Sequence, residues 1–211
     1  MIKIKVCGMR DPFNIKEITN AGPDYLGFIF FSGSKRYVGP DADNAPFQQI
    51  PGRIKKVGVF VDEQPEKILE TAYHFDLDLI QLHGHESVND CRKVKSAGYM
   101  VIKTFGVDAG FNFTSLAPFL QFCDYFLFDT KSEQHGGTGQ KFNWEKIRQY
   151  KYNVPFFLSG GIGPDDSAVI REINHPAFFA VDINSRFETE PGLKNVNHVK
   201  AFIKEIKKVI L

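Results

Sequence analysis

Two residues of the sequence have side chains suited to proton transfer, and each stands at the end of a short apolar run. Cys7 ends the run Ile2–Cys7, and Asp129 follows Tyr125–Phe128. A single cysteine is most often a small buried hydrophobic residue, but a nearby cation or helix N-terminus can lower its pKa from about 8.5 towards neutrality and make it a proton acceptor. An aspartate can simply cap the next segment, or be partly desolvated by aromatic neighbours and carry a proton.

Glycines and polar residues follow the last two apolar runs. Gly160 and Gly161 come directly after Val154–Leu158. Paired glycines occur in plain turns, but they also let the backbone approach a ligand and present N–H groups to it. Asp182, Asn184 and Ser185 lie at the end of the final run and could supply facing donors. We therefore expect two half-sites for a phosphate monoester.

Further polar residues end the runs in between. Arg36 follows the second run, Asp62 the third and His83 the fourth. A solvated arginine or a hydrogen-bonded structural histidine is the ordinary alternative for such positions. No His, Asp or Glu set has metal-ligand spacing, so we expect no metal, and no G-x-S-x-G motif indicates a hydrolase. The loop that begins at Thr130 is long and contains three glycines, which is typical of a lid over a site.

The elements that must position these residues are eight short runs rich in β-branched and aromatic residues. Several are almost continuously apolar, as expected for strands buried on both faces of a parallel sheet. The eight predicted strands are Ile2–Cys7, Tyr25–Phe31, Lys56–Val61, Leu79–Leu82, Met100–Thr104, Tyr125–Phe128, Val154–Leu158 and Phe178–Ile183.

Segments with helical periodicity separate the strands. Pro65 stands where the first turn of a helix tolerates proline, and Gly22 and Gly98 stand where helices would end. The second helix is expected around Asp43–Ile50. The fifth helix should place Phe113, Leu116, Ala117 and Leu120 together, and the last has a stripe of Val199, Phe202, Ile203, Ile206, Val209 and Ile210.

Alternating strands and helices predict parallel pairing with right-handed crossovers. Eight units in 211 residues fit an α/β fold of the (β/α)8 TIM-barrel class, a single catalytic domain over residues 1–211. An open doubly wound sheet is the alternative, but G-x-G-x-x-G is absent after the first strand, and we expect no cofactor. Active sites of barrels lie at the carboxyl ends of the strands, where the polar residues above would gather.

Composition excludes several classes of function. Hydrophobic residues make up 43%, charged residues 24%, and the net charge of +1 gives no field to attract nucleic acid or a membrane surface. Cys7, Cys91 and Cys123 are too scattered for a disulfide framework, and Cys91 and Cys123 have no site-like surroundings. The amino terminus lacks the apolar region of a signal peptide, and no apolar run approaches the roughly 20 residues of a membrane span. We expect a reduced, cytoplasmic protein, monomer or homodimer.

The motifs together resemble those of the phosphoribosylanthranilate isomerase family. The resemblance covers nearly the whole chain in order, and any one motif is weak by itself. Its motifs are Lys5-Val6-Cys7-Gly8, Gly27–Phe31 with Ser34–Val38, Gly58–Val61, Gln81–Gly84, Asp129-Thr130 with Gly136–Gly139 and Phe142–Trp144, Leu158–Ile162, Val181-Asp182 and Pro191–Lys194.

The resemblance implies an Amadori rearrangement of N-(5'-phosphoribosyl)anthranilate, with Asp129 as general acid and Cys7 as general base. It also implies that Arg36 binds the anthranilate end and that Asp182 and His83 lie near the substrate. One departure concerns the turn after Val181-Asp182, where the family commonly has S-S-G and this chain has Asn184-Ser185-Arg186. Arg186 would either restore phosphate affinity by its charge or point into solvent. Another phosphosugar isomerase or epimerase, or a non-catalytic ligand-binding barrel, remains the alternative.

Overall fold

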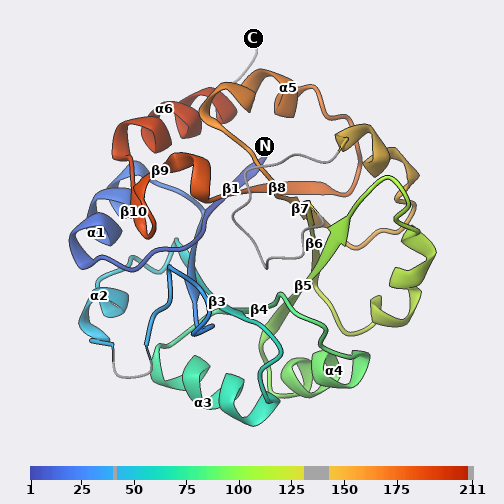
Figure 1. The fold of residues 1–211 in the computed structure, drawn as a ribbon, viewed down its shortest axis with the longest axis horizontal. Coiled ribbons are helices and arrows are strands. Elements are labelled where there is room, and N and C mark those ends of the chain that lie inside the picture. Colours follow the sequence, from blue (N-terminus) through green and yellow to red (C-terminus); the bar gives the residue numbers. More distant parts are fainter. Residues whose placement is uncertain (40–41, 131–142, 209–211) are drawn as a thin grey trace.

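Eight strands close into one parallel barrel in the computed structural model, which describes residues 1–39, 42–130 and 143–208. Each strand pairs with the next along the chain, and β1 closes the ring against β8. The helices lie in a ring outside the strands (Figure 1). This confirms the predicted (β/α)8 barrel. The strands are β1 Lys3–Val6, β2 Tyr25–Ile29, β3 Lys55–Phe60, β4 Leu79–Leu82, β5 Met100–Val107, β6 Tyr125–Thr130, β7 Phe156–Leu158 and β8 Phe178–Ile183.

Local sequence explains where the helices begin and end. The side chain of Asp11 accepts a hydrogen bond from Asn14 N at the start of α1, and Gly22 ends that helix with a left-handed conformation at φ 75°. Ser87 and Asp90 form a capping box at the start of α4. The helices are α1 Pro12–Ala21, α2 Ala45–Gln48, α3 Pro65–His74, α4 Val88–Ser96, α5 Ser167–Arg171 and α6 Val196–Ile206.

The expectation of a full helix after every strand is wrong at three places. The second helix is a single turn, α2. The fifth is a 3-10 helix, η1 (Phe113–Phe119), with Pro118 inside it. The segment after β6 contains another 3-10 helix, η2 (Trp144–Gln149). Residues 131–142, which contain the predicted lid and the Gly136–Gly139 motif, and residues 209–211 lie outside the described residues.

Three small elements lie near the last strands, and two of them, the turn after β8 and the hairpin that follows it, were not predicted. A 3-10 turn, η3 (Pro164–Asp166), precedes α5, and η4 (Ser185–Phe187) follows β8. A two-stranded hairpin, β9 (Glu188–Glu190) and β10 (Leu193–Lys194), stands between η4 and α6. Among the described residues, no helix is long and apolar enough to cross a membrane.

The interior of the barrel changes from apolar to polar towards the carboxyl ends of the strands. One apolar layer takes a residue from each of seven strands: Tyr25, Val57, Leu79, Ile102, Leu127, Phe157 and Ala180. Side chains two residues further along point the same way. Those positions hold Gly27, Val59, Gln81, Thr104, Asp129, Ser159 and Asp182. The apolar layer therefore forms a floor, and the candidate site residues Asp129 and Asp182 stand directly above it.

Candidate active site

Cys7 lies immediately after β1 and is held inside the barrel. Its backbone N donates to Ile183 O at 2.9 Å, and the residue is only 4% exposed. Gly27 on the neighbouring strand makes room for it: a Cβ there would lie 2.8 Å from Cys7 Sγ and 3.1 Å from Lys5 Cε. The thiol and the Lys5 side chain thus share the space that a side chain on β2 would otherwise fill.

Lys5 and Asp182 form a buried ion pair between β1 and β8. Lys5 Nζ lies 3.0 Å from Asp182 Oδ1, and the two side chains are 0% and 5% exposed. The two residues are also direct partners in the strand register. Burial raises the pKa of Asp182 above its ordinary value, although the Lys5 charge opposes it. Burial lowers the pKa of Lys5, but the charges of Asp182 and Cys7 outweigh it and the net change is upward.

The surroundings of Cys7 raise the pKa of its thiol above the ordinary value. Burial raises the pKa of the thiol, and the nearby Asp182 carboxylate adds to the rise. The Lys5 and Lys194 ammonium groups act in the opposite direction but do not outweigh the desolvation. The structure therefore shows no net fall of this pKa towards neutrality. A cation does lie beside the thiol, but the thiol is more deeply buried than its place on the rim suggested.

Asp129 lies near the end of β6, next to the loop that follows β7. Its Oδ1 accepts a hydrogen bond from Thr130 N at 2.8 Å, and its side chain is 17% exposed. A Cβ on Gly160 would lie 2.3 Å from Thr130 Oγ1 and 3.1 Å from Asp129 Oδ1. With a φ of 90°, Gly160 lets the backbone pass against this carboxylate where another residue would collide with it.

His83, just after β4, approaches the other oxygen of Asp129. His83 Nε2 lies 3.5 Å from Asp129 Oδ2, which is longer than a strong hydrogen bond. Gln81 Nε2 lies 2.8 Å from His83 Nδ1. In the neutral tautomer in which Nδ1 accepts from this amide, the ring proton is on Nε2 and points towards the carboxylate. The Gln81 side chain is fully buried, and its Oε1 has no hydrogen-bond partner within the described part of the chain.

Asp182 connects the two proposed proton-transfer groups. It bonds to Lys5 beside Cys7, and the charges of Asp129 and His83 also act on its pKa. β8 is flanked by β1 on one side and by β7, the neighbour of β6, on the other. Cys7 and Asp129 therefore stand on the same end of the barrel, with Asp182 between them.

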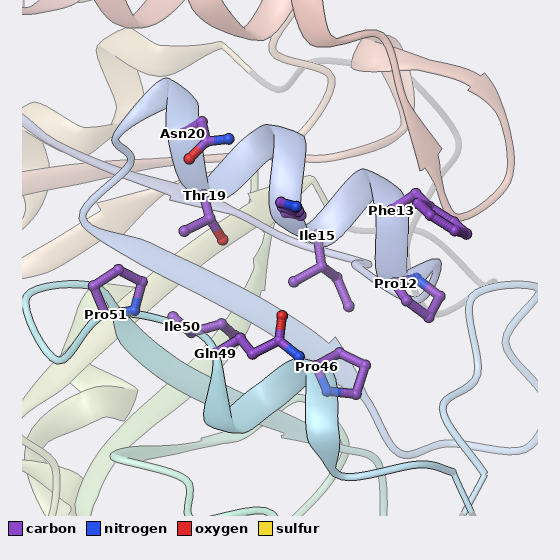
Figure 2. Close-up of a pocket in the computed structure, with 10 residues that line it drawn as sticks. Pro12, Phe13, Ile15, Thr19, Asn20, Pro46, Gln49, Ile50 and Pro51 are labelled. Atoms are coloured by element: carbon purple, nitrogen blue, oxygen red, sulfur yellow. The ribbon is translucent and has the colours of Figure 1, made fainter.

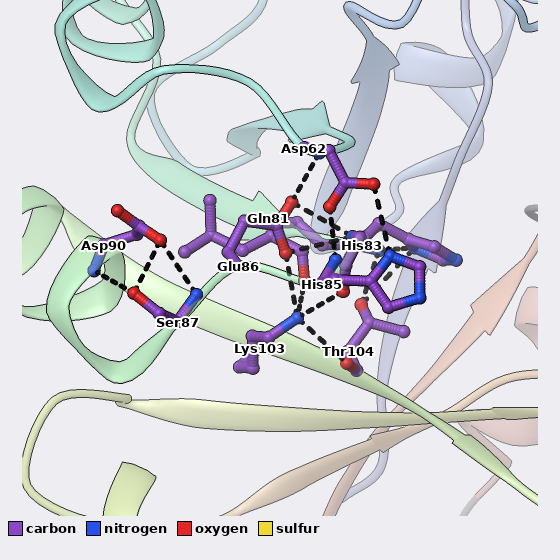
Figure 3. Close-up of polar contacts among 11 residues, drawn as sticks. Asp62, Gln81, His83, His85, Glu86, Ser87, Asp90, Lys103 and Thr104 are labelled. Atoms are coloured by element: carbon purple, nitrogen blue, oxygen red, sulfur yellow. Dashed lines mark hydrogen bonds and ion pairs between the residues drawn. The ribbon is translucent and has the colours of Figure 1, made fainter.

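A second buried ion pair fixes the loop that carries His83 (Figure 3). Lys103 Nζ lies 2.9 Å from Glu86 Oε2, with the side chains 4% and 2% exposed. Lys103 also donates to Gly84 O at 2.8 Å, and Glu86 accepts from the backbone N of Gly84 and of Asp62, each at 3.0 Å. These bonds join the loops after β3 and β4 to the middle of β5 around one charged pair.

Arg36, in the loop after β2, already has a carboxylate partner. Its Nε and Nη2 donate to Glu188 of β9 at 2.8 and 2.6 Å, and this pairing raises the pKa of Arg36. Lys194 Nζ bonds to the same carboxylate at 2.5 Å and to Asn184 Oδ1 at 2.7 Å. Burial lowers the pKa of Lys194 to about 8. A substrate carboxylate would therefore have to meet the remaining Nη1 edge of Arg36.

The two predicted phosphate half-sites lie on adjacent loops. Gly160 and Gly161 both have positive φ, 90° and 65°, and Ser185 begins η4. Arg186 lies beside the first of these loops: its Nε is 3.0 Å from where a Cβ of Gly163 would be. Arg186 is itself exposed to solvent, and its part in phosphate binding stays a prediction.

A groove of about 380 Å³ lies elsewhere, between α1 and α2 on the outside of the barrel (Figure 2). Its lining is mostly apolar, with Phe13 exposed at one end and Pro51 at the other, and Lys16 is its only charged residue among those described. It contains no acid–base pair. Within residues 1–39, 42–130 and 143–208, no three His, Cys, Asp or Glu side chains come together as metal ligands.

Sequence reasoning missed four residues of the site, each for an identifiable reason. Lys5 stood in an alternating Lys–apolar run, where its i, i+2 relation to Cys7 was the available signal. Gln81 and Lys194 appeared in motifs of the family resemblance but were given no role. Glu188 had no signal, because its partners are distant along the chain.

Comparison with known proteins gives one consistent result. The family model described as N-(5'-phosphoribosyl)anthranilate (PRA) isomerase matches residues 4–205. The proteins of that name from Phocaeicola vulgatus and Parabacteroides distasonis are 44% and 43% identical, over 98% and 96% of this chain and 98% and 92% of theirs. The crystal structure of the phosphoribosyl anthranilate isomerase from Thermotoga maritima is similar with a TM-score of 0.83 and 35% identity, covering 98% of this chain and 99% of that one. The chain therefore belongs to the N-(5'-phosphoribosyl)anthranilate isomerase family, enzymes of tryptophan biosynthesis.

Proposed function

We propose that this chain converts N-(5'-phosphoribosyl)anthranilate to 1-(2-carboxyphenylamino)-1-deoxyribulose 5-phosphate, with Asp129 as general acid and Cys7 as general base. The observation that carries the proposal is the common rim that holds both groups, with Asp182 between them. A similar solved structure, 32% identical with a TM-score of 0.79, is that of a phosphoribosyl anthranilate isomerase in complex with reduced 1-(o-carboxyphenylamino)-1-deoxyribulose 5-phosphate. That ligand is a reduced form of the proposed product.

The first step needs an acid because the ribose ring oxygen is a poor leaving group. Asp129 donates a proton to that oxygen, the ring opens, and the anthranilate nitrogen forms a protonated Schiff base with C1'. Gly160 brings the loop after β7 against this carboxylate and helps to exclude water from one side of it. His83 Nε2, 3.5 Å away, favours the anion that remains after the proton has left.

The second step needs a base beside C2'. The positive Schiff base acidifies the C2' hydrogen, and the Cys7 thiolate removes it to give an enolamine, which tautomerises to the ketone. The proton passes from carbon to sulfur, and the electron pair of the C–H bond neutralises the nitrogen. Atoms and charge balance without any cofactor.

The two ends of the substrate would be held on opposite sides of this centre. We assign the phosphate to the loops that carry Gly160, Gly161 and Ser185, whose backbone N–H groups can face an anion. Asn184 bonds to Lys194 and so helps to fix the second loop. Arg36 would take the anthranilate carboxylate through Nη1, while Glu188 holds its other edge in place.

The setting of the enzyme belongs to the same proposal. All three cysteines are free in the structure, which agrees with a reduced cytoplasmic location. Oligomeric state stays open between monomer and homodimer. A solved structure of monomers made from the dimeric Thermotoga maritima enzyme is 33% identical to this chain, with a TM-score of 0.79.

The test is turnover of phosphoribosylanthranilate, followed by the loss of its fluorescence, in Cys7→Ala and Asp129→Ala. Each variant should lose roughly 10²–10⁴-fold in kcat, the usual contribution of a positioned acid or base. Cys91→Ala is the matched control, because it removes a buried thiol on α4 and should keep turnover. If both site variants turn over at the rate of the unmodified protein while remaining folded, the assigned roles are wrong.

A further inference from the structure

The proposed mechanism leaves the buried charge of Lys5 without a role. Lys5 is fully buried in the barrel interior and has a single carboxylate partner among the described residues, Asp182. A buried ammonium is costly, and a buried ion pair gives at best a small net gain in stability over an apolar pair. A barrel that needed only packing at this position would be served by leucine or methionine. The charge therefore calls for a functional explanation.

The position of Lys5 relative to Cys7 supplies one. The two residues are two apart at the end of β1, so both side chains point into the barrel. Both side chains approach the same place beside Gly27 on β2. A Cβ on Gly27 would lie 2.8 Å from Cys7 Sγ and 3.1 Å from Lys5 Cε. The ammonium beyond Cε is held by Asp182, whose carboxylate lies 3.0 Å away. The lysine thus presents a fixed positive charge close to the sulfur.

The other charges around the thiol come from three further elements. Asp182 faces it from β8, Lys194 from β10, and Arg36 from the loop after β2. Glu188 on β9 binds both Arg36 and Lys194. Together with Lys5, these groups are three cations and two carboxylates. One positive charge is left over, which a thiolate at Cys7 would balance.

We propose that Lys5 is a positioning residue for the base: its ammonium, held by Asp182, stabilises the thiolate form of Cys7 in a site too dry to stabilise it by hydration. The inference rests on the proposed function, because it gives Cys7 the role of base. Lys5 keeps its proton throughout; only sulfur gains the proton that C2' loses. Lys194 is less suited to this task because Glu188 and Asn184 already occupy its ammonium.

The test is a pH titration of the Cys7 thiolate in the full chain, by its ultraviolet absorbance, taken as the difference from Cys7→Ala. Lys5→Met should raise the midpoint of ionisation by about one to three pH units, the effect of losing a close opposite charge. Asp182→Asn should lower the midpoint by about one unit, because a like charge next to the thiolate is lost. A merely structural role for the pair predicts no such opposite shifts, since each variant would disturb the same packing.

Two controls separate charge from folding. Lys3→Met removes a lysine on the same strand that pairs with Asp24 at the other end of the barrel, and it should leave the Cys7 midpoint unchanged. Lys5→Arg keeps the charge and should return the midpoint most of the way to that of the unmodified protein. Should Lys5→Met fail to fold with Asp182 unpaired, Lys5→Met/Asp182→Asn removes both charges. Its midpoint should lie about one to three units above that of Asp182→Asn alone.

The outcomes distinguish the inference from the proposed function. The inference is overturned if Lys5→Met leaves the Cys7 midpoint unchanged or lowers it, whether Asp182 is present or replaced by asparagine. This holds even if Cys7→Ala is inactive. Midpoints that move the same way in Lys5→Met and Asp182→Asn overturn it too. Full turnover in Cys7→Ala would instead refute the role of Cys7 as base. When the inference holds, the rising limb of kcat/KM against pH moves with the thiolate midpoint in Lys5→Met.

Discussion

The buried Lys103–Glu86 pair allows a stability prediction whose size can be worked out from the structure. In Lys103→Met the ammonium disappears and Glu86, 2% exposed, loses its only cationic partner among the described residues. Breaking a buried pair by removing one partner typically costs about 3–5 kcal/mol. Glu86 still accepts from the backbone N of Asp62 and of Gly84. We therefore expect Lys103→Met to lower the free energy of unfolding by about 3 kcal/mol, the lower end of that range. The total stability of such a domain is about 5–15 kcal/mol.

A double variant separates the cost of removing both charges from the cost of leaving the Glu86 carboxylate buried without a cation. In Lys103→Met/Glu86→Gln no charge is left buried, and the amide oxygen can still accept from the two backbone N–H groups. We expect a loss below about 2 kcal/mol, less than in Lys103→Met alone. The exposed Lys93–Glu66 pair is the matched control, and Lys93→Met should not change the free energy of unfolding measurably.

Urea unfolding followed by far-ultraviolet circular dichroism gives these free energies. Turnover, measured well below the unfolding midpoint, should also fall in Lys103→Met, because Lys103 donates to Gly84 O beside His83. The reasoning is refuted if the double variant is less stable than Lys103→Met, since the cost would then come from packing and not from an unpaired carboxylate.

Two further predictions concern the Cys7 thiol and the ion pair that joins Arg36, in the loop after β2, to Glu188 of the hairpin. Gly27→Ala places a methyl group 2.8 Å from Cys7 Sγ, so the free energy of unfolding should fall by about 1–3 kcal/mol. Turnover should fall about tenfold or more. Gly52→Ala, whose methyl group would have nothing within 4 Å, is the control and should change neither quantity in thermal unfolding and activity assays. Burial raises the pKa of Glu188, but the bonds from Arg36 and Lys194 outweigh it, so the net pKa lies below the ordinary 4.5. The ionised carboxylate therefore stabilises the folded protein above pH 4.5, and this stabilisation is lost as the pH falls through the pKa of Glu188 in the folded state. Glu188→Gln should therefore show a weaker loss of stability on acidification in denaturation midpoints measured against pH, and an unchanged slope would contradict this assignment.

Some features of the site could be read from the chain because they depend on local pattern. The apolar runs fixed the eight strands, and their alternation with helical segments predicted the barrel. Residues that end those runs must share one rim in such a fold, which is why Cys7, Asp129 and Gly160 could be named together. The helix start at Pro65 followed from a local rule, the tolerance of proline in a first helical turn.

The partners of those residues depended on contacts between distant segments. Lys5 meets Asp182 across 177 positions, and Arg36 meets Glu188 across 152, so no local pattern revealed either pair. Ionisation followed the same rule: the sequence placed Cys7 on a rim, where a cation could lower its pKa, but the depth of burial decides the net direction, which is upward. The sequence alone determined which groups stand at the carboxyl ends of the strands. Only the tertiary structure decided how deeply each is buried and which charge faces it, because desolvation and Coulomb energy depend on distances in space and not on distances along the chain.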